Sequence, residues 1–359
     1  VQGKKVLGIG SPRASLESNF ALRELVGQDN YSTGMSQKEQ SLVELAASIM
    51  QTEGVYNPGM REIESYDAVL ILGEDLTQTA PRMALSVRQA AKNKGKEMAA
   101  ERRTQDWLAE PVQRIAQDAK SPIYILAATQ TRLSDIAEGE VVASPNDIAR
   151  LGFAVAAAVK GETVSGLADD AKAFAQTIAD TLKAAKKPLI ISGTSLQDAS
   201  IMEAAAQVAQ NLGNAGLTLT VPEVNSMGLA IFGGQSLEQA FAQDFDTVVV
   251  VENDLYRRLP AAQVDAALAG KEVLVLDLSE TATVAKANIV LSAASFAEGD
   301  GTVVSQEGRA QRFYQVYDPS YYKPELAIKE SWRWLHAIET GVKGKAISWT
   351  LLDDVIESV

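Results

Sequence analysis

The 359-residue sequence contains no cysteine and only one histidine, His336. Without cysteine, the chain itself cannot form disulfides, thiol nucleophiles, zinc–thiolate sites or cysteine-held iron–sulfur clusters. A histidine-based metal site or a Ser-His-Asp triad would have to be built on His336, which lies beside tryptophans near the C-terminus. We expect that imidazole to pack on a helix rather than to bind a metal or to react. These absences exclude several chemistries and name no function.

Positive charge and long apolar runs are also scarce. The 33 Lys and Arg are outnumbered by 46 Asp and Glu, so the net charge is −13, which argues against a nucleic-acid or anionic-membrane surface. The nearest approach to a basic patch is residues 92–96 with Arg102 and Arg103; it is interrupted by two glutamates and predicts a solvated helix end. The longest strand-like run, residues 247–251, falls far short of the roughly 20 residues that cross a bilayer.

Short β-branched runs alternate with amphipathic segments along the whole chain. Strands are predicted at residues 4–10, 68–74, 123–129, 188–193, 217–221, 247–251, 272–277 and 288–292. Helices are predicted at residues 16–26, 42–50, 83–92, 148–159, 171–185, 201–212 and 261–268. The Val, Ile and Leu runs are continuous, which is typical of strands covered on both faces. The sequence therefore predicts an α/β protein whose mostly parallel sheets are covered by helices.

One strand and its following loop occur twice. Residues 66–81 align without a gap with residues 245–260: each copy has an aromatic residue and Asp, aliphatic residues, an acidic loop with Asp-Leu, and a proline near a helix start. This pattern is one βα unit. Two explanations stay open. Any two βα units of this class look alike, or the chain has two related α/β lobes whose strand-end loops face a shared ligand crevice.

A glycine-containing turn follows the first predicted strand. Residues 8–13 read Gly-Ile-Gly-Ser-Pro-Arg and precede a helix, the right setting for a phosphate-binding turn. Arg13 stands where the third glycine of G-x-G-x-x-G belongs, and no acidic residue follows a second strand at the usual distance. The segment is either a tight strand-to-helix turn or the site of an α/β binding module for a small anionic ligand.

The most distinctive stretch is residues 293–311. Asp300-Gly301 is a type I′ hairpin signal, and Glu307-Gly308-Arg309 places opposite charges on either side of a flexible residue. Exposed glycine amides with a fixed arginine could hold an anionic ligand. Equally, Glu298, Glu307 and Arg309 could form a structural ion-pair cluster.

Five segments spread along the chain carry a family resemblance. They are residues 10–27, 75–82, 225–228, 287–294 and 298–319. Together they resemble the molybdopterin oxidoreductase family, whose fold is that of formate dehydrogenase and DMSO reductase. Within it, they look most like the large iron–sulfur subunits of bacterial NADH:quinone oxidoreductases (complex I), and the resemblance covers essentially the whole chain.

The resemblance implies two lobes that are not sequential in the chain. Residues 1–55 plus 171–327 would form a first, discontinuous α/β lobe, residues 56–170 an inserted α/β lobe, and residues 328–359 a C-terminal helical segment. In the family the lobes hold pterin nucleotides, so by this resemblance the loop at residues 298–311 would approach a pterin. The vestigial cofactor-binding candidates are Gly301, Thr302, Glu307, Gly308 and Arg309.

The chain departs from active family members where they bind the metal. They supply a Cys, selenocysteine, Ser or Asp soon after the first helix, whereas residues 29–40 here offer Ser32 and Ser36 and no Cys. Residues 72–75, Leu-Gly-Glu-Asp, present carboxylates that would repel a phosphodiester. We therefore expect no catalytic residue, metal or cofactor in this region. The alternative is an active molybdopterin-dependent oxidoreductase with Ser as metal ligand and Thr302, Glu307 and Arg309 at the pterin.

The resemblance implies a scaffold role in the peripheral arm of complex I. The region would support electron transfer from NADH to quinone without a redox centre of its own, and the iron–sulfur clusters would lie in an N-terminal part of the full subunit. Its partners would be other peripheral-arm subunits and the subunit's own cluster-bearing domains, with no nucleic acid and no direct membrane insertion. The location implied is the cytoplasmic side of the bacterial inner membrane.

Overall fold

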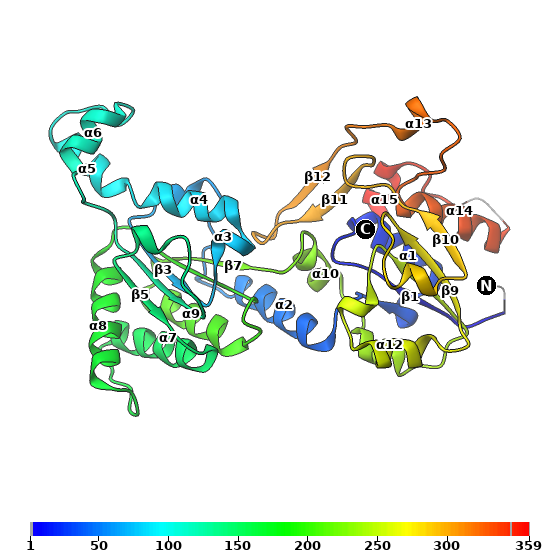
Figure 1. Ribbon diagram of the computed structural model, residues 1–359, viewed down its shortest axis with the longest axis horizontal. Helices are drawn as coiled ribbons and strands as arrows, with labels where there is room; N and C mark the ends of the chain where they lie inside the picture. Colours follow the sequence, from blue (N-terminus) through cyan, green and yellow to red (C-terminus); the bar gives the residue numbers. More distant parts are fainter. Residues whose placement is uncertain (1–2, 345–346, 359) are drawn as a thin grey trace. The chain divides into compact units, whose positions relative to one another are not determined.

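The computed structural model describes residues 3–344 and 347–358 and divides the chain into two units (Figure 1). Unit 1 comprises Val1–Glu44 and Glu223–Val359, and unit 2 comprises Leu45–Pro222. Helix α2 (Gln37–Met50) contains the first boundary between them. Among the described residues, no helix has the length and apolar character needed to span a membrane.

Unit 1 is built on a five-stranded parallel sheet in the order β10-β9-β8-β1-β2. Its strands are β1 (Val6–Ile9), β2 (Tyr31–Ser32), β8 (Thr247–Val251), β9 (Glu272–Asp277) and β10 (Ile289–Ser292). Its helices are α1 (Leu16–Val26), α10 (Ser226–Phe232), α11 (Leu237–Phe241), α12 (Ala261–Leu268), α13 (Pro319–Tyr322), α14 (Ser331–Lys343) and α15 (Leu352–Ser358). A separate antiparallel hairpin consists of β11 (Gly301–Val304) and β12 (Ala310–Phe313).

Unit 2 repeats this plan with a five-stranded parallel sheet in the order β5-β4-β3-β6-β7. Its strands are β3 (Ala68–Leu72), β4 (Ile123–Ala127), β5 (Gly139–Val142), β6 (Pro188–Gly193) and β7 (Gly216–Thr220). Its helices are α3 (Leu76–Thr79), α4 (Pro81–Ala90), α5 (Asn93–Glu101), α6 (Ala109–Ala116), α7 (Pro145–Lys160), α8 (Asp169–Ala184) and α9 (Ala199–Leu212).

The central strands are buried on both faces. In β8, every residue of Thr-Val-Val-Val-Val is buried. Val248 and Val250 pack in a cluster with side chains of α12, whereas Val249 and Val251 pack in a second cluster with side chains of α1 and α14. Alternate strand residues point to opposite faces, so two helical layers require a continuous apolar run. The predicted α/β class, with mostly parallel sheets covered by helices, is confirmed.

The structure places the lobe boundaries differently from the predicted ones. Strand β6 pairs with β3, and β7 pairs with β6, so residues 171–222 belong to unit 2. Residues 45–55 also belong to unit 2, and only residues 1–44 of the predicted first segment lie in unit 1. The predicted C-terminal segment, residues 328–359, is part of unit 1, because Trp332 and Val355 are buried in the same cluster as Phe20. Local periodicity identifies a βα unit but does not say which strand it pairs with.

The predicted hairpin turn at Asp300-Gly301 is wrong. Gly301 is the first residue of β11, opposite Phe313 of β12, and the turn lies at residues 305–309, where Ser305 N donates to Arg309 O. A Cβ on Gly301 would lie 2.7 Å from atoms of both Ser15 and Phe313. This glycine therefore permits a close approach of the strand to its neighbours and does not form a turn.

Candidate functional site

Each sheet has a point where the strand order reverses, which is where ligands of such sheets bind. In unit 1 the chain builds outward from β1 to β2 on one side and from β8 through β9 to β10 on the other, so the reversal lies between β1 and β8. In unit 2 the reversal lies between β3 and β6 for the same reason. The residues that follow these strands are therefore the first candidates for a binding site in each unit.

In unit 1, Asn253 is the second residue after the end of β8 and is fully buried. Its Nδ2 donates to Gly10 O at 2.8 Å and to Gly34 O at 2.9 Å, so one amide joins the loops that follow β1 and β2. Its Oδ1 accepts from Arg258 Nε at 3.1 Å. A Cβ on Gly34 would lie 1.9 Å from Gly10 O, and the φ of Gly34 is +76°. The Asn253 side chain thus fixes the strand-end loops against one another.

Arg258 extends this network to two carboxylates. It donates to Glu39 Oε1 at 2.9 Å and to Glu223 Oε2 at 2.6 Å, and all three side chains are largely buried. Burial raises the pKa of Glu39, and Arg258 opposes that rise. The N–H donors of the guanidinium therefore bond groups of the protein itself. These bonds connect the segment after β8 to the start of α2.

In unit 2, Glu74 lies directly after Gly73, at the end of β3, and is 1% exposed. Its carboxyl group accepts from Ser195 N at 3.0 Å, from Thr79 Oγ1 at 3.0 Å and from the Ser195 hydroxyl. Burial raises the pKa of Glu74, although these donors lower it. Ser195 belongs to the turn between β6 and α9, and the amides of such a turn are the groups that bind anions in related sheets. Glu74 accepts from one of them, the Ser195 amide.

A cavity of about 610 Å³ lies at the edge of the unit 1 sheet where its parallel strands end. Its lining combines aromatic and aliphatic side chains with charged ones, among them Arg13, Glu252, Phe296, Val303, Phe313 and Ser331. Arg13 Nη2 donates to Glu252 O at 2.7 Å, and Ser331 Oγ donates to Glu252 Oε1 at 2.6 Å. Burial raises the pKa of Glu252 to about 7. The cavity therefore presents a carboxyl group that changes its charge near neutral pH.

The five pterin-loop candidates do not come together in one site. Gly301 and Thr302 begin β11, and Thr302 N donates to Glu17 Oε2 of α1 at 2.9 Å. The other three lie at the hairpin turn, where Arg309 Nη2 is 3.6 Å from Glu307 Oε2 and the Arg309 side chain is 68% exposed. Gly308 has a φ of +72° and serves the turn. Glu298 instead accepts from Ser295 N through Oε2, at 2.9 Å.

The glycine turn at residues 8–13 uses its amides within the protein. Gly10 N donates to Ser32 O at 2.8 Å, Ser11 N to Asn19 Oδ1 at 3.1 Å, and Arg13 N to Ser11 Oγ at 3.1 Å. A phosphate would have to displace these partners to use the same donors.

The two serines considered as metal ligands have backbone partners. Ser32 Oγ donates to Gln235 O at 2.9 Å and accepts from Gly34 N, and Ser36 Oγ accepts from Glu39 N at 3.3 Å. His336 lies on α14 with its ring 5.1 Å from that of Trp349, edge to face. Among the residues that the structure describes, no three His, Asp or Glu side chains gather as a metal site would require.

Sequence patterns single out Glu74 but not Asn253 or Glu252. A signal for both is present in the repeat, which aligns Gly73 with Glu252 and Glu74 with Asn253. The two aligned strand-end residues have the same left-handed backbone, with φ +80° at Gly73 and +50° at Glu252. In each copy of the repeat, the polar residue after this position therefore marks the switch point of its sheet.

Comparisons with known proteins agree on a family and a fold. The family model of molybdopterin oxidoreductases matches residues 2–336. The chain is 52% identical over 366 residues to the NADH-quinone oxidoreductase subunit designated G of Pseudomonas putida, a match that covers 99% of this chain and 40% of that protein. It is 50% identical over 369 residues to the Escherichia coli K12 protein of the same name, covering 100% and 41%. The chain thus spans about two fifths of the length of these relatives.

Two solved structures share the fold at low sequence identity. One is a chain of the formyltransferase/hydrolase complex of Methylorubrum extorquens, with a TM-score of 0.63, 15% identity, and coverage of 95% of this chain and 92% of that one. The other is acetylene hydratase from Pelobacter acetylenicus, with a TM-score of 0.54, 11% identity, and coverage of 95% and 56%.

Proposed function

The chain belongs to the molybdopterin oxidoreductase family, and from that premise we propose that it is a molybdoenzyme-like scaffold region of an NADH:quinone oxidoreductase subunit with no redox centre of its own. The observation that carries the proposal is the buried Glu74 carboxyl group, which takes the Ser195 amide, the Ser195 hydroxyl and the Thr79 hydroxyl at the switch point of unit 2. A protein side chain stands where a ligand's anion would bind.

The residues at both switch points do not fit a phosphate-bearing pterin. In unit 2, a phosphate would meet the Glu74 carboxyl group and would find the Ser195 donors taken. Burial of a phosphate without such donors is strongly unfavourable. In unit 1, the amides of Gly10 and Ser11 are bonded to Ser32 O and Asn19 Oδ1. We therefore assign no chemical step to a pterin in this chain.

The whole subunit would contribute the electron transfer. Both bacterial relatives are named as a subunit of NADH-quinone oxidoreductase, and this chain matches two fifths of their length. We infer that the remaining part holds the iron–sulfur clusters and that this region packs against it and against other peripheral-arm subunits. The complex would transfer electrons from NADH to quinone, with this region peripheral on the cytoplasmic side of the bacterial inner membrane.

The scaffold role is tested by removing the region from the whole subunit in its own cells. Native gel electrophoresis of the membranes would measure the assembled complex, and electron paramagnetic resonance would measure the clusters. We expect loss of the assembled complex, while the truncated subunit keeps its cluster signals. A truncated subunit that assembles into a complex with full NADH:quinone activity would contradict the proposal.

A further inference from the structure

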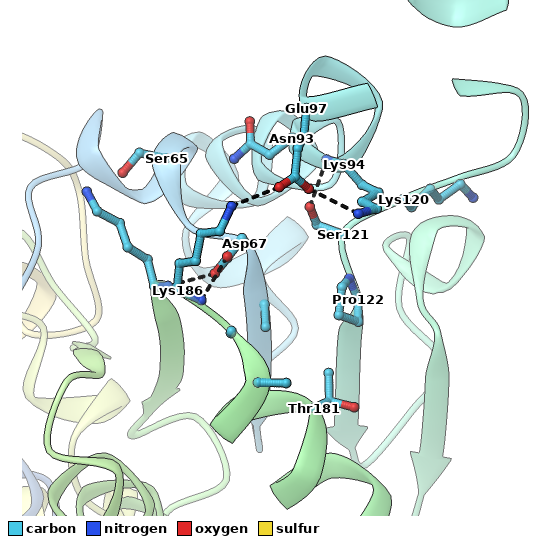
Figure 2. Close-up of a pocket in the computed structure, with 14 residues that line it drawn as sticks. Ser65, Asp67, Asn93, Lys94, Glu97, Lys120, Ser121, Pro122, Thr181 and Lys186 are labelled. Carbon is cyan, nitrogen blue, oxygen red and sulfur yellow. Dashed lines mark hydrogen bonds and ion pairs between the residues drawn. The ribbon is translucent and has the colours of Figure 1, made fainter. Parts of the chain in front are cut away.

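A second cavity, of about 910 Å³, lies at the opposite, amino-terminal edge of the unit 2 sheet (Figure 2). It is lined by residues that precede three strands: Asp67 before β3, Ser121 and Pro122 before β4, and Lys186 before β6. Helix α5 supplies Asn93, Lys94 and Glu97 to its other side. The sequence predicts a solvated helix end for the basic residues near 92–96, whereas the fold brings one of them, Lys94, together with lysines that precede β4 and β6.

The cavity concentrates positive charge on a strongly acidic chain. Lys94, Lys120, Lys186 and Lys187 line it against two carboxylates, Asp67 and Glu97, while the whole chain has a net charge of −13. A local excess of one sign creates a field that attracts the opposite one, even when the molecule as a whole repels it.

The Glu97 carboxylate responds to the positive charge of the neighbouring lysines. Its Oε1 lies 2.8 Å from Lys186 Nζ and its Oε2 lies 3.0 Å from Lys94 Nζ, as Figure 2 shows. The hydrogen bond from Lys186, then that from Lys94, lowers the pKa of Glu97 to about 2. An anion is therefore favoured at this position, and the protein supplies one of its own.

The donors that line the cavity are ammonium groups rather than backbone amides: those of Lys94 and Lys186 bond Glu97, and that of Lys120 donates to Asp135 O at 2.9 Å. Asp67 accepts from Lys186 N at 2.9 Å and from Lys187 N at 2.8 Å, and Ser121 Oγ accepts from Lys94 N at 3.1 Å. Phosphate sites usually rely on such backbone N–H groups. Long, flexible lysines with the local amides already satisfied are better suited to the carboxylates of a flexible chain.

The same helical hairpin that carries Lys94 and Glu97 also exposes apolar side chains. Between α5 and α6, Trp107 is 73% and Leu108 is 44% exposed, and all eight residues of α6 keep solvent-accessible surface. Figure 1 shows α5 and α6 extending from α4 away from the strands of unit 2. Exposed aromatic side chains of this kind are typical of a protein interface.

We propose that the lysine-lined cavity binds an acidic segment of a protein partner, with Glu97 as the internal counter-ion that the partner's carboxylates displace from Lys94 and Lys186. The proposal gives the chemistry of one partner of the scaffold region, and to that extent it rests on the proposed function. It needs no cofactor, and its test does not depend on assembly of the complex.

The test measures binding of a fluorescein-labelled oligo-glutamate peptide to the purified chain by fluorescence anisotropy, at several salt concentrations. We expect salt-sensitive binding that K186Q weakens and E97Q tightens, each by about two- to fivefold, since each change removes or frees one exposed ion pair. The matched control is K172Q, which makes the same charge change on α8, where Lys172 pairs with Asp169 outside the cavity.

Three outcomes would overturn the proposal. The first is no binding of the peptide at low salt, and the second is an equal effect of K172Q and K186Q, which would mean attraction by net charge alone. The third is tripolyphosphate binding more tightly than the peptide with the same pattern of variants, which would assign the cavity to a phosphate ligand. An intact scaffold role with any of these results would leave the proposed function standing and remove only the acidic partner.

Discussion

The same strand-to-helix corner occurs once in each unit, and the two copies satisfy their loops with side chains of opposite hydrogen-bonding character. In unit 1, Glu252-Asn253 follows β8, and the Asn253 amide donates to two carbonyl oxygens. In unit 2, Gly73-Glu74 follows β3, and the Glu74 carboxyl group accepts from an amide and two hydroxyls. The backbone of the first residue is left-handed in both copies.

The difference follows from what the neighbouring loops present. Gly10 and Gly34 turn their carbonyl oxygens toward the switch point of unit 1, which therefore requires a donor. The β6–α9 turn directs the Ser195 N–H toward the switch point of unit 2, which therefore requires an acceptor. At each switch point a side chain complements the backbone groups of the neighbouring loops, and this complementarity can be tested in each unit separately.

The largest expected effect is that of Gly34→Ala in unit 1. The new Cβ would lie 1.9 Å from Gly10 O and 2.3 Å from Asn253 Nδ2, at a φ of +76°. We expect the free energy of unfolding to fall by about 4 kcal/mol or more, because backbone and a buried amide must both move. The control is Gly270→Ala, with a φ of +70° and no atom within 4 Å of its Cβ, for which about 1 kcal/mol is expected. Equal losses of unfolding free energy for the two variants in urea denaturation would contradict a close contact at Gly34.

Reversing the polarity of the unit 1 corner should have the next largest effect. In Asn253→Asp, a carboxylate would face Gly10 O and Gly34 O, and both hydrogen bonds would be lost at neutral pH. We expect a loss of about 3 kcal/mol. The loss should shrink in acid, where a protonated Asp can donate to one of the carbonyls. A variant as stable as the parent at neutral pH would show that this position in unit 1 does not require a hydrogen-bond donor.

The free energy of unfolding should depend on pH through Glu252, the residue with left-handed backbone in unit 1. The folded pKa of Glu252 is about 7, above its ordinary value of 4.5, so the folded state holds a proton that the unfolded state releases. The stability that Glu252 contributes is fully present below about pH 4.5 and is lost as the pH rises through about 7, by about 3 kcal/mol. Glu252→Gln should flatten this part of the curve in denaturant titrations between about pH 5 and pH 8.

Asp277 leaves a residual slope of the same sign in that variant, because burial also raises its pKa. Stability that instead rises with pH over this range in the parent, and not in Glu252→Gln, would show that Glu252 is charged in the folded protein.

The smallest effect is expected for Glu74→Gln in unit 2. Burial raises the pKa of Glu74, so a neutral side chain suits the site, and the Gln oxygen can still accept from Ser195 N. We expect a loss of about 1 kcal/mol in thermal or urea unfolding, against nearly none for the exposed Glu203→Gln on α9. A loss as large as that of Asn253→Asp would mean that the two corners do not differ in polarity.

Local sequence patterns are sufficient for the fold class and insufficient for the strand partners. Continuous aliphatic runs such as residues 247–251 predict strands buried on both faces, and β8 is one. The pairing of β6 with β3 depends on contacts between residues far apart in sequence, and no local period encodes it. Asp300-Gly301 has the composition of a turn, but packing of Gly301 against Ser15 and Phe313 overrides that preference.

The site residues show the same limit. The carboxylates of residues 72–75 are visible in the sequence as unsuited to a phosphate, and Glu74 lies at the switch point. Asn253 could not be assigned from its type, since a buried asparagine gains its role only from the carbonyls that neighbouring loops direct at it.

The central claim, that this region carries no redox centre, is tested most directly by the molybdenum, tungsten and pterin content of the chain purified from its own cells. Elemental analysis would measure the metals, and fluorescence of oxidised extracts after denaturation would measure the pterin. The account predicts far less than one metal and one pterin per chain. A stoichiometric metal together with a stoichiometric pterin would contradict it.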